Sequence, residues 1–152
     1  MSTREELHEL SIAEAGAGLR AGTLTSTALT QHALDRIATL DPVLNAFILV
    51  TKERALADAE RADRELKSGI DKGPMHGIPH ALKDIYETAG IRTTCHSKLM
   101  LDHVPNEDGT AAAKLKADDA ATGGGRADGA AGVGAHRRAH HSGGDRDARA
   151  GR

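Results

Sequence analysis

The composition of the chain changes near residue 118, and this change limits where a folded core can form. All seven lysines and every leucine lie at or before Lys116. Nine of the 17 glycines lie after residue 118, where the only large aliphatic residue is Val133. Such a segment cannot bury enough apolar surface to offset its conformational entropy. We therefore expect a folded part in residues 1–118 and a low-complexity, disordered tail in residues 119–152.

The composition of the tail suggests where it comes from. Arginine is its only strongly basic residue, and it occurs with Ala, Gly, His and Asp. This mixture is typical of a GC-rich coding region read in a shifted frame, and a native flexible tail is the alternative. A nucleic-acid-binding arm is disfavoured, because Asp128, Asp145 and Asp147 interrupt the basic residues and the tail has no aromatic side chain to stack on bases.

The whole chain has the features of a cytoplasmic protein. Its formal net charge is −2, which gives no general attraction to polyanions. Its apolar runs are shorter than the ~20 residues that a membrane helix needs. The N-terminus, MSTREELHEL, lacks the apolar core of a secretory signal, and the single cysteine, Cys95, cannot form a disulfide within the chain. We expect neither a membrane partner nor direct contact with nucleic acid.

The pattern of residues 1–118 predicts helices that alternate with strands. Ser11 and Glu14 fit a capping box at the start of a first helix, and Asp41-Pro42 is expected to end the second. The predicted helices span residues 11–21, 25–41, 52–68 and 107–116, and the predicted strands span 45–50 and 78–85. This order favours an α/β protein with a strand-helix-strand unit. Because two strands do not make a stable sheet, further strands are required.

The stretch GPMHGIPHALKD, residues 73–84, places a lysine in a strand that follows a rigid turn. Its glycines and prolines prevent a regular helix before the strand. Lys83 lies in a largely apolar run, so we expect it to be buried. Burial lowers the pKa of a lysine, and a neutral amine can take a proton from a hydroxyl group. From the residues alone, an edge-strand lysine whose amine reaches water is the favoured explanation.

Residues 73–105, GPMHGIPHALKDIYETAGIRTTCHSKLMLDHVP, resemble the start of the conserved core of the amidase signature family. That family typically reads GPLHGIPxxxKDxxxxxGxxTTxGS, followed by D-x-x-P. The resemblance extends over roughly residues 8–118. It implies that the chain is an N-terminal fragment of an α/β fold with helices around a mixed sheet. It also implies a hydrolase of carboxylic amides that uses a Ser-Ser-Lys triad and an acyl-serine intermediate, without a cofactor.

The resemblance assigns roles to residues of the motif. Lys83 stands where the family has its catalytic lysine and would act as general base. Gly77 and Pro79 are expected to hold the start of the strand in place. Thr93, Thr94 and Ser97 are expected either to support the site through hydrogen bonds or to form a plain turn. The residues that bind the substrate cannot be assigned, because in this family they lie mostly further along the chain.

The motif also departs from the family. His80 replaces a usual aliphatic residue, and His96 replaces a usual glycine at a position that favours a positive φ. The two serines of the family triad come well downstream, one of them in a Gly/Ser-rich loop of the type GGSSGGS. These 152 residues contain no such loop, and the only serine after Ser97 is Ser142. We therefore expect the chain by itself to be catalytically inactive.

We expect no metal site. His76 and His80 are four residues apart, which on a strand separates two side chains by ~13 Å, too far for one metal ion. His136, His140 and His141 could bind a metal adventitiously, but no carboxylate or thiol completes a plausible site with them.

Three functions remain open at this point. The first is an amidase acting on a small-molecule amide, as a monomer or a homodimer. The second is a fragment of the amidase subunit of a glutamine-dependent tRNA amidotransferase, which releases ammonia from glutamine for partner subunits. The third is a non-enzymatic helical interaction module.

Overall fold

The computed structural model describes residues 7–118 and 132–135. The elements within these residues are α1 (Ile12–Arg20), α2 (Ser26–Leu44), β1 (Phe47–Val50), α3 (Lys52–Lys67), β2 (His80–Lys83), the 3-10 helix η1 (Lys98–Met100), α4 (Thr110–Asp118) and β3 (Gly132–Ala135). The predicted order of helix, helix, strand, helix, strand and helix is confirmed, with η1 and β3 as additions. Among these elements, no helix is long and apolar enough to cross a membrane.

The three strands form a mixed sheet in the order β1-β3-β2. β3 runs antiparallel to β1, with Val133 opposite Val50, and parallel to β2, with Ala135 opposite Lys83. The mixed sheet agrees with the predicted fold class. β3 comes from the segment expected to be disordered, and the rest of that segment lies outside the described residues. A strand can form there because β1 and β2 each present backbone groups that any extended segment can pair with.

The predicted start of the first helix is confirmed. The Glu14 backbone N–H donates to Ser11 Oγ at 3.2 Å, and the Ser11 N–H donates to Glu14 Oε2 at 2.8 Å. α2 begins in a similar way, since the Ala28 N–H donates to Thr25 Oγ1 at 3.1 Å. Both caps satisfy backbone donors that a helix leaves unpaired at its N-terminus.

The prediction that Asp41-Pro42 ends the second helix is wrong. A proline lacks an N–H and disfavours a helical residue before it. α2 nevertheless continues beyond Pro42 and ends at Asn45, which has a left-handed φ of 48°. The Asn45 N–H donates to the Asp41 carbonyl at 2.7 Å. Asp41 Oδ1 also accepts from the N–H groups of Ala46 at 2.6 Å and Phe47 at 3.0 Å, which secures the last turn.

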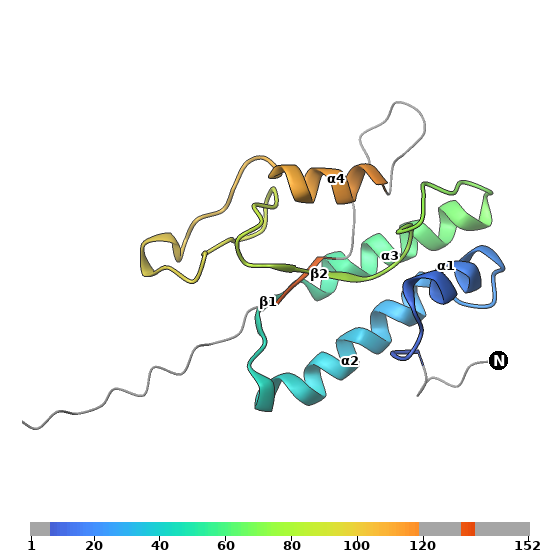
Figure 1. Ribbon diagram of the computed structural model, residues 1–152, viewed down its shortest axis with the longest axis horizontal. Helices are drawn as coiled ribbons and strands as arrows, with labels where there is room; N and C mark the ends of the chain where they lie inside the picture. Colours follow the sequence, from blue (N-terminus) through green and yellow to red (C-terminus); the bar gives the residue numbers. More distant parts are fainter. Residues whose placement is uncertain (1–6, 119–131, 136–152) are drawn as a thin grey trace, which may run out of the picture.

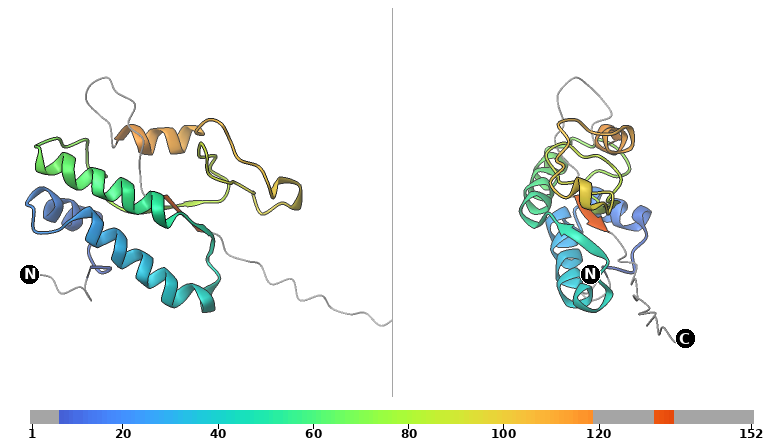
Figure 2. Two further views of the ribbon diagram at one scale, coloured as in Figure 1. Left: turned by 180° about the vertical axis from the view of Figure 1, so that it is seen from behind. Right: turned by 90° about the vertical axis from the view of Figure 1, so that its left-hand side faces the viewer.

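The helices lie in layers around the strands. In Figure 1, α2 lies below the strands and α4 above them, and the end-on view of Figure 2 keeps this order. α3 faces the other elements with small side chains, because Ala55, Ala59 and Ala62 are buried at helical spacing. The main apolar cluster consists of Leu7, Ala15, Leu19, Leu29 and Ile78.

One apolar face of this arrangement stays open. A cavity of about 450 Å³ is lined mainly by apolar side chains of α2 and of the segments beside it, such as Leu29, Ile37 and Phe47. At the C-terminal end of α2, Val43 is 84% exposed and Leu44 is 62% exposed. The described residues therefore leave part of the apolar surface uncovered.

Candidate active site

The Gly/Pro stretch folds into two successive turns that lead into β2. The His76 N–H donates to the Gly73 carbonyl at 3.0 Å, and the Ile78 N–H donates to the Met75 carbonyl at 3.0 Å. Gly73 and Gly77 have φ values of 136° and 77°, which favour glycine. The prediction of a rigid, non-helical turn before the strand is confirmed.

Two polar contacts fasten this turn to α1 and α2. The buried Ser26 hydroxyl donates to the Gly77 carbonyl at 2.7 Å. Arg20 Nη2 donates to the Gly73 carbonyl at 2.8 Å, while its Nε contacts Asp71 Oδ2 at 2.7 Å. A Cβ atom on Gly77 would lie 3.2 Å from Ser26 Cβ, so the backbone approach itself requires glycine here. Pro79 follows directly and is half-buried.

Lys83 lies at the C-terminal end of β2 and is exposed. This agrees with the edge-strand lysine that the residues alone favoured, and it differs from the buried lysine that the apolar run suggested. The reason is topological: β2 is an edge strand of the sheet, with β3 on one side, and its burial alternates so that Lys83 falls on an exposed position. The described residues therefore place the amine at the surface.

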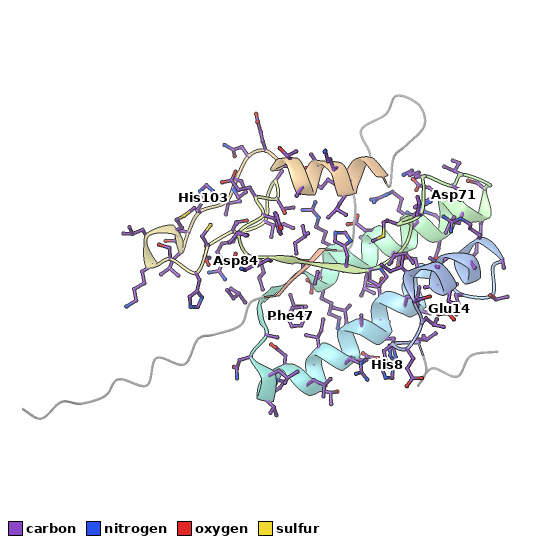
Figure 3. The ribbon with its side chains drawn as sticks, viewed as in Figure 1. His8, Glu14, Phe47, Asp71, Asp84 and His103 are labelled. Carbon is purple, nitrogen blue, oxygen red and sulfur yellow. The ribbon has the colours of Figure 1, made fainter. Side chains whose placement is uncertain are left out.

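Asp84, the residue after Lys83, organises the loop that returns to the strand. Its carboxylate accepts hydrogen bonds from the Thr94 hydroxyl, from the Thr94 N–H at 2.8 Å and from the His96 N–H at 3.3 Å. Its backbone carbonyl accepts from the Cys95 N–H at 2.9 Å. Asp84 lies at one end of β2, as Figure 3 shows, far from Asp71 near the other end. The structure thus brings Thr94 next to Asp84, the residue that follows Lys83.

The other predicted support residues have local roles. Thr93 is buried, and its N–H donates to the His103 carbonyl at 3.0 Å. Ser97 accepts the Leu99 N–H at 3.2 Å and so caps η1. Ser97 is therefore placed to shape the loop, and it is tied to Thr94 through its own N–H at 2.8 Å.

A cavity of about 50 Å³ lies beside the end of β2. Its lining includes Lys83, Asp84 and Thr93, together with the half-buried His80. Burial lowers the pKa of His80, although a backbone hydrogen bond at Ile78 and the charge of Asp58 act in the opposite direction. The imidazole at this position adds a polar group to the cavity where the family usually has an aliphatic side chain.

The expectation of a positive φ at His96 is confirmed. His96 has φ 56°, and its neighbour Cys95 has φ 49°, so two successive non-glycine residues are left-handed. Such residues cost conformational energy that the surrounding contacts must offset. Here the hydrogen bonds to Asp84 supply those contacts. Cys95 itself is exposed.

Within residues 7–118 and 132–135, no group of three or more His, Cys, Asp and Glu side chains could hold a metal ion. His76 and His80 lie apart, the former against α3 and the latter on β2. His136, His140, His141 and Ser142 lie outside the described residues.

The residues that fix the turn in place were missing from the sequence prediction. They belong to α1, α2, α3 and the segment after α3, and they are Arg20, Ser26, Glu65, Asp71, Lys72 and His76. Local patterns gave no signal for them, because their partners are separated by up to 53 positions. Asp84 is a partial exception, since it belongs to the Lys-Asp pair of the motif.

A Gly/Pro turn packed against helices, followed by a lysine-bearing strand of a mixed sheet, is the arrangement expected for the start of an amidase-signature fold. Residues 28–126 match the family described as Amidase, which is more than half of the chain. The chain belongs to the amidase family, and the resemblance of the sequence motif is confirmed.

Similar proteins include a peptide amidase and one component of a tRNA-dependent amidotransferase. The A subunit of glutamyl-tRNA(Gln) amidotransferase from Geobacter metallireducens is 52% identical over 111 residues, which are 73% of this chain and 23% of that protein. The structure of peptide amidase from Stenotrophomonas maltophilia has a TM-score of 0.69 and 32% identity, and the match covers 85% of this chain and 24% of that chain. Fatty acid amide hydrolase, with a TM-score of 0.74 and 22% identity, shares the fold. The chain spans about a quarter of the length of these relatives.

Proposed function

We propose that residues 1–118 are the lysine-bearing N-terminal part of an active site that hydrolyses carboxylic amides, with Lys83 as general base. The observation that carries this proposal is the GPMHGIPHALKD motif. It lies within the region that matches the amidase family, and its turn is fastened to α1 and α2 so that β2 ends in Lys83 and Asp84.

The proposed chemistry divides amide hydrolysis into two steps. A serine hydroxyl attacks the amide carbonyl, Lys83 takes the hydroxyl proton, and the proton passes on to the departing amine. Water then attacks the acyl-serine, which releases the acid and restores the serine. A lysine can act in this way only when its amine is neutral. Because Lys83 is exposed among the described residues, we propose that further chain segments cover it in the working site.

The 152-residue chain by itself is proposed to be inactive. Serine is the nucleophile in this scheme, and the sequence contains no Gly/Ser-rich loop of the family type. Ammonia release from glutamine and from simple peptide amides by the purified chain should stay at the level of a buffer blank. Hydrolysis that is robust and disappears in Lys83→Ala would contradict the proposal.

A role in a tRNA-dependent amidotransferase is the second candidate function. The observation in its favour is the higher identity to amidotransferase A subunits, up to 52%, than to the peptide amidase, 32%. Co-purification of the full-length protein with amidotransferase partner subunits would discriminate the two candidates, and a chimera tests whether this segment can complete an active site. In it, residues 8–118 replace the aligned segment of the Geobacter metallireducens protein, which supplies the remaining three quarters of the chain.

The chimera should release ammonia from glutamine if residues 8–118 can complete the amidotransferase site. A folded chimera without this activity would count against the amidotransferase role. Under both candidate functions Lys83→Ala should abolish turnover, since both use the lysine as base.

A further inference from the structure

The contacts of the buried His76 imidazole indicate which of its ring nitrogens holds the proton. The residue is 2% exposed. The Lys72 backbone N–H donates to His76 Nδ1 at 3.2 Å, and His76 Nε2 lies 2.9 Å from Glu65 Oε2. Because a backbone N–H can only donate, Nδ1 must be unprotonated. The proton of the neutral ring therefore sits on Nε2 and is donated to the Glu65 carboxylate.

The charges around the ring are balanced without a charge on the ring itself. Glu65, on α3, pairs with Lys72 Nζ at 2.7 Å. Asp71 Oδ1 lies 3.9 Å from His76 Nδ1, and Asp71 pairs with Arg20 of α1 at 2.7 Å. These four residues are two carboxylates and two cations. A neutral imidazole thus fits a site whose charges are already compensated.

Both carboxylates are held in their ionised form. Burial raises the pKa of Glu65, but the hydrogen bonds from Lys72 and His76 and the charge of Lys72 outweigh it, so the pKa is lowered. The hydrogen bond from Arg20 lowers the pKa of Asp71 against the effect of burial. Glu65 therefore remains an acceptor for His76 across the pH range in which histidine titrates.

Protonation of Nδ1 would break this arrangement. The Lys72 N–H would lose its acceptor and face a second N–H group instead. The new Nδ1–H would point toward Asp71 Oδ1, which at 3.9 Å is too far for a hydrogen bond without movement. The Asp71–Lys72 segment, which leads directly into the Gly73–Pro79 turn, would have to shift.

We propose that neutral His76 is a positioning residue that fixes the Gly73–Pro79 turn to α3 and releases it when the ring is protonated. The turn leads into β2. His76 therefore determines the position of the start of the strand and, through the strand, the position of Lys83. This last step rests on the proposed role of Lys83, whereas the two hydrogen bonds and their dependence on the ring proton do not.

NMR of the full 152-residue chain labelled with ¹⁵N tests the proposal. At neutral pH the His76 ring should show the signature of the Nε2–H tautomer. As the pH is lowered until the ring spectrum shows the second proton, the protection factor of the Lys72 amide should fall about five- to tenfold, the change expected for one net hydrogen bond. An Nδ1–H tautomer, or Lys72 protection that ignores the state of the ring, would overturn the proposal.

Two variants separate positioning from bulk packing. His76→Asn places an amide oxygen near the position of Nδ1 and cannot be protonated, so Lys72 should stay protected at every pH. His76→Ala should lose that protection at every pH. His103→Asn is the matched control, since His103 also contacts a glutamate, Glu87 at 3.1 Å, but is 37% exposed. Equal loss in His76→Asn and His76→Ala would contradict the proposal. Lys83→Ala should leave all these signals unchanged. The NMR experiment therefore tests the role of His76 independently of the proposed catalytic role of Lys83.

Discussion

The two ends of β2 are built in opposite ways. At its N-terminal end, His76 and Ile78 are buried, and Gly77 packs directly against Ser26. At its C-terminal end, Lys83 is exposed. Ile85 and Tyr86, which follow the half-buried Asp84, are also open, at 47% and 42% exposed. Figure 3 shows Asp84 at the C-terminal end of β2 and Asp71 well away from it, beside the end of α3.

This difference separates position from chemistry. The described residues fix where the strand starts and in which direction it runs. They leave the lysine amine in contact with water, where a lysine is normally charged. We expect residues at the N-terminal end of β2 to contribute to the stability of the fold, and Lys83 at the C-terminal end to contribute to function.

The largest effect on stability is expected at Gly77. Gly77→Ala should lower the free energy of unfolding by roughly 2–5 kcal/mol, because a left-handed φ costs a non-glycine residue about 1–2 kcal/mol and the crowding against Ser26 adds about 1–3 kcal/mol. Gly22→Ala is the matched control. Gly22 has φ 70° but open space around it, so only the first part of the cost applies.

Chemical denaturation of both variants measures this difference. Equal losses at Gly77 and Gly22 would show that the close packing of the turn on α2 contributes nothing.

Ser26→Ala should cost about 1–2 kcal/mol. Its hydroxyl donates to the Gly77 carbonyl in a buried site, and removal leaves that acceptor unpaired. Ser68→Ala removes a hydroxyl that donates to the Glu65 carbonyl at 2.7 Å in an exposed position, so its cost should be well below that of Ser26→Ala. Urea midpoints of the two variants, compared with the parent chain, give the answer. A larger loss of stability in Ser68→Ala than in Ser26→Ala would contradict the claim that the Ser26 hydroxyl stabilises the turn.

Acid should weaken the N-terminal end of β2. The folded-state pKa of Glu65 lies below its usual value of 4.5, and that of Asp71 lies below 3.8. A lowered carboxylate pKa contributes stability that is present above the usual value and is lost as the pH falls through the folded-state value. Urea midpoints should therefore drop below about pH 4.5 and fall further below about pH 3.8.

Glu65→Gln should flatten the upper part of this pH profile, while Glu60→Gln, an exposed change on the same helix, should leave it intact. An unchanged profile in Glu65→Gln would show that the contacts of Glu65 with Lys72 and His76 do not stabilise the fold.

The smallest effect on stability is expected at Lys83. Lys83→Ala removes an exposed side chain from the end of an edge strand, and such changes usually stay within about 0.5 kcal/mol. A loss above roughly 2 kcal/mol would mean that Lys83 makes contacts essential to the fold, and the separation between the two ends of β2 would fail.

The sequence predicted features that depend on near neighbours. Ser11 and Glu14 revealed the start of α1, and the departure at His96 correctly indicated a left-handed position. The motif with Gly77 and Lys83 identified the family, because its spacing is specific.

Features that depend on distant segments were not predictable. The apolar run around Lys83 left both burial and exposure open, and the place of β2 at the edge of the sheet gives the exposed position that the residues favoured. α2 continues beyond Pro42 because the Asp41 carboxylate accepts hydrogen bonds from backbone N–H groups that follow the helix. β3 pairs with both other strands, which are far from it in the sequence. The sequence of β3 has too few large apolar residues to predict a strand.

The most direct test of the central claim is ammonia release by the chimera that carries residues 8–118, measured for Lys83→Arg and Lys67→Arg. Both changes keep a positive charge, but arginine cannot serve as a base. The account predicts that Lys83→Arg lowers turnover at least about 100-fold, the usual contribution of a general base, and that Lys67→Arg on the exposed end of α3 leaves it unchanged. Full activity in Lys83→Arg would contradict the claim that Lys83 is the catalytic base.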